Sequence, residues 1–156
     1  MKFHSPMILV SDIDKSRKFY IDLLNEVVEQ DLGSYIVFKG GFSMMNKSQW
    51  ENLTKTSMIQ NSSKEYSFEL YFEEDDIDSF IQKLSKHKVE ILTQLEEAPW
   101  GQRAIRILDL DNHVIEIAES MESVVRKYLG QGLESKDVSS KTLMPIDFIN
   151  KVKENL

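Results

Sequence analysis

The chain has 156 residues, of which 41% are apolar and 29% charged, a composition typical of one folded domain and unlike that of a disordered or fibrous protein. Its formal net charge of -7 opposes binding to nucleic acid or to an anionic membrane, because both are negatively charged. The absence of cysteine excludes disulfides and Cys-bound zinc, and no apolar run approaches the roughly 20 residues that span a bilayer. The N-terminus also lacks the apolar stretch of a signal peptide. We therefore expect a cytoplasmic protein whose partner is a small molecule.

The first part of the chain, residues 1–50, predicts a module of strands around one helix. An apolar strand over residues 7–10 is followed by a helix over residues 14–27, in which apolar residues recur at helical spacing. Two further strands, at 35–38 and 42–45, flank Lys39-Gly40-Gly41 and predict a hairpin. From about residue 49 to 64 no period is visible, and we assign residues 51–64 to a linker.

The same plan recurs over residues 65–119. A strand at 66–72, a helix at 76–86 and a strand at 89–92 precede two strands, at 103–108 and 113–118, that flank a turn rich in Asp and Asn. The letters Asp12-Ile13-Asp14 recur as Asp76-Ile77-Asp78, each time after a strand and at the start of a helix. This pattern predicts an α+β fold in which two β-α-β-β-β modules pair to close one core.

Residues 120–156 predict a C-terminal helical extension. Residues 121–129 have a helical pattern, Gly130-Gln131-Gly132 breaks it, and one or two short helices follow from Ser135. Acidic and basic residues balance in this region, whereas DNA binding requires a basic surface. We expect the helices to pack against the sheet or a second subunit, and we expect a homodimer.

Two passages carry a family resemblance. The run Val-Ser-Asp-Ile-Asp-Lys-Ser-Arg-Lys-Phe-Tyr at residues 10–20 resembles the first strand-to-helix passage of the vicinal-oxygen-chelate superfamily, which includes glyoxalase I, extradiol dioxygenases and bleomycin-binding proteins. The run Asp-Leu-Asp-Asn-His-Val-Ile-Glu-Ile at residues 109–117 is similar to its last hairpin. The resemblance covers residues 4–119 and implies one curved, eight-stranded mixed sheet that forms a cup around the site.

The resemblance leaves three functions open. The first is a divalent-metal-dependent lyase, isomerase or dioxygenase. The second is a metal-free protein that sequesters its ligand, as bleomycin-resistance proteins do. The third is a ligand-responsive regulator that uses the C-terminal helices, and binding to DNA would favour it. Fold analogy alone cannot choose among them.

The metal ligands that the resemblance implies are only partly present. Family members use His or Gln on the first strand, Glu on the fourth, His on the fifth and Glu on the eighth; here only Glu116 matches in type, and Glu69 replaces the second His. His4 is one residue out of phase unless a bulge realigns it, and Met44 or Met45 occupies the remaining position. The implied set for Zn, Ni, Mn or Fe is thus His4, Glu69 and Glu116, with either Glu as a catalytic proton carrier. Alternatively, the carboxylates pair with a cation, accept hydrogen bonds, or one of them stays protonated.

The substrate-binding candidates surround the start of the seventh predicted strand. In Pro99-Trp100-Gly101-Gln102-Arg103, Trp100 could stack on a planar ligand, and Arg103 could bind an anionic group or pair with Glu69 or Glu116. Strand alternation places Tyr71 on the face of Glu69, where it would supply a hydroxyl. The alternative is an ordinary Pro-Gly turn with a packing Trp and a surface Arg. We predict that Tyr71, Trp100, Gln102 and Arg103 contact a planar or anionic ligand.

Overall fold

The computed structural model describes residues 1–56 and 66–156, which form two compact units. The first unit contains Met1–Glu69 together with Leu108–Val114, and the second contains Leu70–Ile107 together with Ile115–Leu156. No helix within the two described ranges is long and apolar enough to cross a membrane. We describe each unit by itself.

The first unit is built on a four-stranded sheet. Its strands run in the order β1-β4-β3-β2, with β1 at Met7–Val10, β2 at Val28–Asp31, β3 at Tyr35–Phe38 and β4 at Ser43–Asn46. Strand β1 is parallel to β4, whereas β3 is antiparallel to both of its neighbours. The parallel pairing brings the first and last strands of the module side by side.

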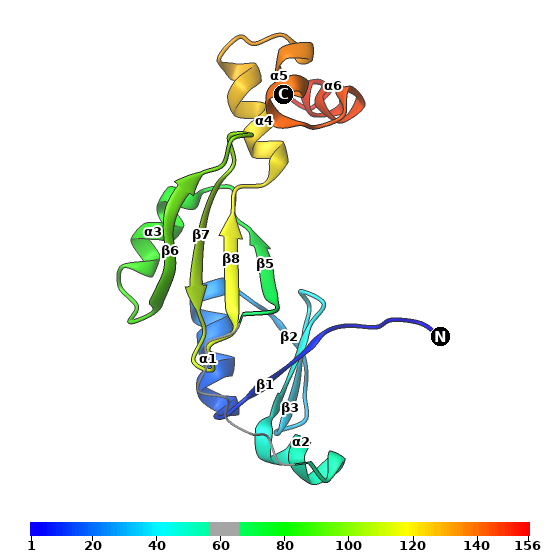
Figure 1. The fold of residues 1–156 in the computed structure, drawn as a ribbon, viewed down its shortest axis with the longest axis vertical. Helices are drawn as coiled ribbons and strands as arrows, with labels where there is room; N and C mark the ends of the chain where they lie inside the picture. The colour runs from blue at the N-terminus through cyan, green and yellow to red at the C-terminus, as the bar shows by residue number, and fades with distance from the viewer. Residues whose placement is uncertain (57–65) are drawn as a thin grey trace. The chain divides into compact units, whose positions relative to one another are not determined.

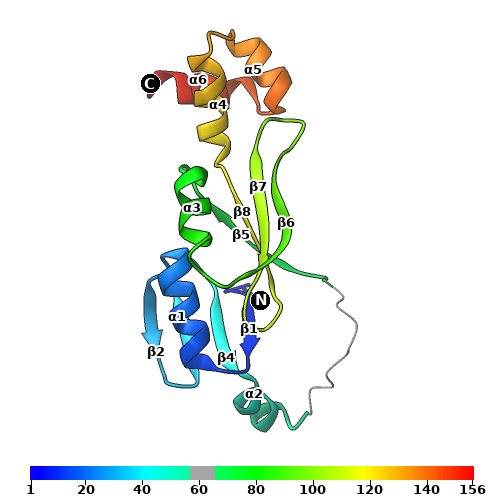
Figure 2. The same ribbon diagram turned by 90° about the vertical axis from the view of Figure 1, so that its left-hand side faces the viewer.

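Helix α1, at Ile13–Leu24, covers one face of this sheet (Figure 2). Asp12 begins the helix by accepting the backbone N–H of Lys15 at 3.0 Å, which satisfies one of the free donors of the first turn. The buried side of α1 carries Tyr20, whose ring centroid lies 5.7 Å from that of Phe38 on β3. Tyr20 and Phe38 are both 0% exposed, so this contact lies at the centre of the unit's core.

The second unit has a four-stranded sheet in the order β5-β8-β7-β6 (Figure 1). The strands are β5 at Glu69–Glu73, β6 at Glu90–Glu97, β7 at Arg103–Leu108 and β8 at Val114–Ala118. All five residues of β8 are buried, because this strand lies between β5 and β7. Helix α3, at Ile77–Leu84, buries Ile77, Phe80 and Leu84, which share one side of the helix.

Three helices follow β8 and gather beyond the β6–β7 turn (Figure 2): α4 at Met121–Gly130, α5 at Ser135–Thr142 and α6 at Ile146–Glu154. Ser120 begins α4 by accepting the backbone N–H of Ser123 at 3.1 Å. The three helices share a core of Val124, Val125, Tyr128, Val138, Ile149 and Val152. The predicted C-terminal helical extension is therefore present.

The turn between β7 and β8 belongs to the first unit and is fixed by two aspartates. Asp109 accepts the Tyr20 hydroxyl at 2.9 Å; burial, together with the charge of Asp109, raises the pKa of Tyr20, so this hydroxyl remains a donor. Asp111 accepts the backbone N–H of Ser11 at 3.0 Å and pairs with Lys47 at 2.5 Å. These contacts explain why an Asp-rich turn follows β7.

The predicted α+β class and the order of the main elements are confirmed, but the single eight-stranded sheet is wrong. The described residues form two four-stranded sheets. Each module completes its own hydrogen-bonded sheet, because β1 returns beside β4 in the first module and β5 lies beside β8 in the second.

Two elements appear where the sequence shows no pattern. Strand β2 is exposed along most of its length and is held as an edge strand by backbone pairing with β3. Helix α2, at Lys47–Thr54, extends into the predicted linker; Asn46 caps it and it buries no side chain, so it leaves no apolar period in the sequence. Residues 57–64 of that linker, together with residue 65, lie outside the described residues.

Candidate functional site

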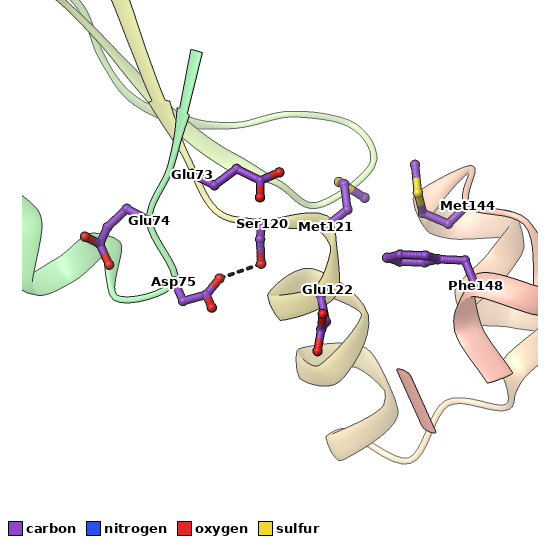
Figure 3. A pocket seen from close by; sticks show the side chains of 8 residues that line it. All are labelled: Glu73, Glu74, Asp75, Ser120, Met121, Glu122, Met144 and Phe148. Carbon is purple, nitrogen blue, oxygen red and sulfur yellow. Dashed lines mark hydrogen bonds between the residues drawn. The ribbon is translucent and has the colours of Figure 1, made fainter. Parts of the chain in front are cut away.

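Two of the hollows in the second unit combine polar and apolar side chains. The larger, of about 680 Å³, lies between the end of β5, the start of α4 and the region that leads into α6 (Figure 3). Its carboxylates have partners: Asp75 accepts the Ser120 hydroxyl, and Glu122 pairs with Arg126 at 2.5 Å. Met144 and Phe148 supply its apolar side.

The smaller hollow, of about 280 Å³, lies against the strands β6, β7 and β8. Its lining combines an aromatic ring, an amide and an ion pair, contributed by three strands and one turn. The lining residues are Thr93, Gln94, Glu96, Glu97, Ala98, Pro99, Trp100, Gln102, Ala104, Arg106 and Glu116.

The pairing of β7 with β8 decides which side chains reach this hollow. The backbone N–H of Glu119 donates to the carbonyl of Arg103 at 3.0 Å, so these two residues lie opposite one another. Three residues further toward the turn, Arg106 therefore lies opposite Glu116. Because side chains alternate along a strand, Arg106 and Glu116 lie on the face opposite to Arg103 and Glu119.

Arg106 and Glu116 form an ion pair inside the hollow. The Glu116 side chain is 11% exposed and that of Arg106 is 37% exposed. A carboxylate so shielded from water needs a compensating charge or hydrogen bonds, and Arg106 supplies both. Glu116 is consequently engaged by a guanidinium of its own sheet.

Hydrogen bonds link the turn between β6 and β7 to β5 and to the residue that follows β8. Trp100 Nε1 donates to Gln102 Oε1 at 2.9 Å. The Gln102 amide in turn donates to the Tyr71 hydroxyl at 3.1 Å and to the backbone carbonyl of Glu119 at 2.7 Å. Gln102 is 9% exposed and Trp100 is 38% exposed, so a buried amide holds a ring that is partly open to solvent.

Arg103 points to the other face of the sheet. It donates to Glu119 at 2.7 and 2.9 Å and to Asp78 of α3 at 3.0 Å. Hydrogen bonds to Glu119 and then to Asp78 raise the pKa of Arg103, so it remains charged. The structure thus places Arg103 in an ion-pair cluster between β7, β8 and α3, and not in the lining of the hollow.

The remaining predicted site residues belong to the first unit. His4 is exposed, and its Nδ1 lies 3.4 Å from the hydroxyl of the adjacent Ser5. Glu69 is the first residue of β5 and its side chain is exposed. Since Glu116 belongs to the second unit, a site shared by His4, Glu69 and Glu116 remains a prediction.

Comparison with known proteins agrees with this architecture. The family described as a glyoxalase-like domain matches residues 3–122. This chain belongs to the glyoxalase-like family. The resemblance to the vicinal-oxygen-chelate superfamily is thereby confirmed. A search of the curated proteins gave no match.

Solved structures provide further comparisons. A protein of unknown function from Agrobacterium tumefaciens is 38% identical, with a TM-score of 0.68 over 77% of this chain and 94% of that chain. A lactoylglutathione lyase from Agrobacterium tumefaciens is 16% identical, with a TM-score of 0.58 over 75% and 92%. The fosfomycin resistance protein FosX of Listeria monocytogenes, a mutant complexed with Mn(II) and 1S,2S-dihydroxypropylphosphonic acid, is 17% identical, with a TM-score of 0.55 over 81% and 97%. The last two comparisons show the fold.

The structure gives no metal site among the described side chains of this glyoxalase-like chain. Residues 1–56 and 66–156 contain no group of three or more His, Asp or Glu side chains that could hold an ion. Glu116, which matches the family ligand in type, is paired with Arg106. Within the second unit, the carboxylate that matches the family ligand in type is therefore engaged by a cation.

Sequence analysis missed Arg106, although a signal for it existed. The predicted turn at residues 109–112 fixes the register of the hairpin, and counting outward from it pairs Arg106 with Glu116 and Arg103 with Glu119. Opposite charges at facing positions stabilise an antiparallel pair. This count separates the two arginines onto different faces.

Proposed function

We propose that this glyoxalase-like protein binds a small planar organic molecule in the hollow over β6, β7 and β8, and holds it without a metal. The observation that carries the proposal is the convergence of Trp100, Gln102 and the Arg106–Glu116 pair on one hollow of about 280 Å³. This volume is near the lower end of the roughly 300–1,000 Å³ of ligand pockets, which favours a compact ligand. As the sequence predicts, we also propose that the protein is a cytoplasmic homodimer.

The lining indicates how such a ligand is recognised. Trp100 is 38% exposed beside the hollow, and its hydrogen bond to Gln102 fixes the orientation of its ring. The ring therefore offers a surface on which a planar ligand can stack. Arg106, with 37% of its side chain exposed, can turn a guanidinium donor toward an acceptor on the ligand while it remains paired with Glu116. The ligand is therefore a planar molecule with an oxygen acceptor or an anionic group at one edge.

The same contacts favour a ligand-sequestering protein over a metal-dependent lyase, isomerase or dioxygenase. Proton transfer requires a carboxylate that can exchange protons with the substrate, and Glu116 is held by Arg106. The ring of Trp100 and the amide of Gln102 can retain a ligand without any reaction taking place. A role in resistance, by sequestering a toxic small molecule, is consistent with this site.

A fluorescence titration tests the proposal. In a Trp50→Phe protein, Trp100 is the remaining tryptophan, and 8-anilinonaphthalene-1-sulfonate serves as a planar, anionic probe. We expect saturable quenching of Trp100, and about three- to tenfold weaker binding in Arg106→Gln, from the loss of a charge-assisted contact. Phe148→Leu, in the larger hollow, is the matched control and should not change the affinity. Binding that is lost in Phe148→Leu but kept in Arg106→Gln would reject this site.

A further inference from the structure

We propose that the C-terminal helical extension is part of the ligand site, because Tyr128 of α4 positions Trp100 and Gln102 from behind. This inference rests on the proposed function and adds to it a positioning residue and a reason for the extension. The family match ends at residue 122, so Tyr128 lies beyond the glyoxalase-like domain.

The turn between β6 and β7 is tightly closed. The Ala98 N–H donates to the Gln102 carbonyl at 2.8 Å, and the Gly101 N–H donates to the Ala98 carbonyl at 2.8 Å. Gly101 has a φ of +88°, a conformation that side-chain-bearing residues rarely adopt. Trp100 and Gln102, the two residues that flank Gly101, both line the hollow.

Tyr128 packs directly against the back of this turn. A Cβ atom added to Gly101 would lie 2.0 Å from the Tyr128 hydroxyl oxygen and 2.7 Å from two ring carbons. The ring therefore occupies the space that any larger residue at position 101 would need. Tyr128 is 3% exposed and belongs to the shared core of α4, α5 and α6, so the ring cannot swing away without opening that core.

Two neighbouring contacts hold the helix and the turn together. Lys127, adjacent to Tyr128, pairs with Glu97 at the end of β6 at 3.1 Å. On the other side, the Gln102 amide donates to the carbonyl of Glu119, the residue before the Ser120 cap of α4. The β6–β7 turn is thus connected both to the start of α4, through Glu119, and to the residue Lys127 further along α4.

The consequence is a stiff ligand-facing edge. Trp100 reaches the hollow from a turn against which Tyr128 packs at Gly101, so movement of this turn toward α4 would require α4 to move. A ring held in this way loses little conformational entropy on stacking, and it selects ligands that fit one fixed position. In our interpretation the extension sets the affinity and the size limit of the site.

The test makes two measurements on the Trp50→Phe protein, one without and one with a bound probe. Acrylamide quenching reports how accessible Trp100 is, and 8-anilinonaphthalene-1-sulfonate reports binding. Trp100 is 38% exposed in the unchanged protein, so for Tyr128→Leu we expect about two- to threefold stronger quenching and about three- to tenfold weaker probe binding. Tyr128→Phe, which keeps the ring, should retain most of both signals.

Val152→Ala is the matched control, because it weakens the same helical core from α6, whereas Tyr128 lies on α4. Unchanged quenching in a folded Tyr128→Leu protein, or an equal change in Val152→Ala, would overturn the inference. If Tyr128→Leu does not fold, Lys127→Ala decides: loss of its pairing with Glu97 should raise quenching, and no change would count against the inference. Failure of the probe to bind any variant, with the quenching differences intact, would reject the proposed function and leave the positioning role in place.

Discussion

The ion pair between Arg106 and Glu116 should contribute measurably to stability, and a double-mutant cycle can isolate its contribution. The changes are Arg106→Gln, Glu116→Gln and the two together. Glutamine keeps hydrogen-bonding capacity and most of the side-chain volume, so the cycle mainly removes charge. Whatever else either side chain contacts cancels in the difference between the single and double variants.

The expected size follows from the exposure of the two side chains. Fully exposed pairs contribute about 0.2–1 kcal/mol, whereas removing one partner of a buried pair costs about 3–5 kcal/mol. Glu116, at 11% exposed, is largely shielded, but Arg106, at 37%, is partly solvated. We therefore expect a coupling free energy of about 1–2 kcal/mol, with Arg106→Gln the more harmful single change, because it leaves a shielded carboxylate without its cation.

The assay is urea unfolding at neutral pH and low salt, followed by far-ultraviolet circular dichroism and by tryptophan fluorescence. Coincident transitions are required, because the chain has two compact units. Added salt should reduce the coupling only slightly, since the pair is partly shielded. A coupling below about 0.5 kcal/mol would refute the view that Arg106 engages Glu116, and would leave that carboxylate available for another role.

Three further predictions concern the turns and the metal. Gly101→Ala should lower the free energy of unfolding by about 2–4 kcal/mol, because position 101 has a positive φ and an added Cβ would collide with Tyr128. Gly33 also has a positive φ, of +79°, but lies in open space, so Gly33→Ala should lower the free energy of unfolding by only about 1–2 kcal/mol. Equal losses in chemical denaturation would contradict this prediction. Burial alone would raise the pKa of Asp111, but hydrogen bonds from Lys47 and Ser11 outweigh it and lower that pKa. Its stabilisation is therefore present above about pH 4 and lost as the pH falls further, so Asp111→Asn should flatten the acid limb of a stability-versus-pH curve. Protein purified without added metal should contain well under one equivalent of Zn, Ni, Mn or Fe by elemental analysis, and a full, tightly held equivalent would overturn the assessment of the ligand set.

The sequence could predict those parts of the fold that depend on burial. Helices α1 and α3 each bury one side, and strands β3 and β8 are apolar except at Glu116, so their patterns are visible. Strand β2 and helix α2 bury almost nothing and are held by backbone pairing and a cap, which leave no hydrophobic period. The grouping of strands into two sheets is a property of long-range pairing, for which the sequence has no local signal.

Several of the predicted site residues lie together in the structure, and their roles remain predictions. Trp100, Gln102 and Glu116 line one hollow, and Gln102 contacts the hydroxyl of Tyr71. The sequence prediction allowed Arg103 to pair with Glu116, whereas the hairpin register places Arg103 opposite Glu119. Strand alternation, applied across the hairpin and not only along one strand, would have distinguished the two faces.

The first unit is assembled from two separated stretches of sequence, and this affects how the protein is made. Leu108–Val114 completes that unit, and Asp109 within it accepts the buried hydroxyl of Tyr20. A ribosome that has translated the first module must therefore add Leu70–Ile107 before the partner of Tyr20 exists, which takes several seconds at about 5–20 residues per second. During that interval the nascent chain carries an unfinished core, so a stop codon or a protease cut between the modules would release a fragment that cannot complete its own fold.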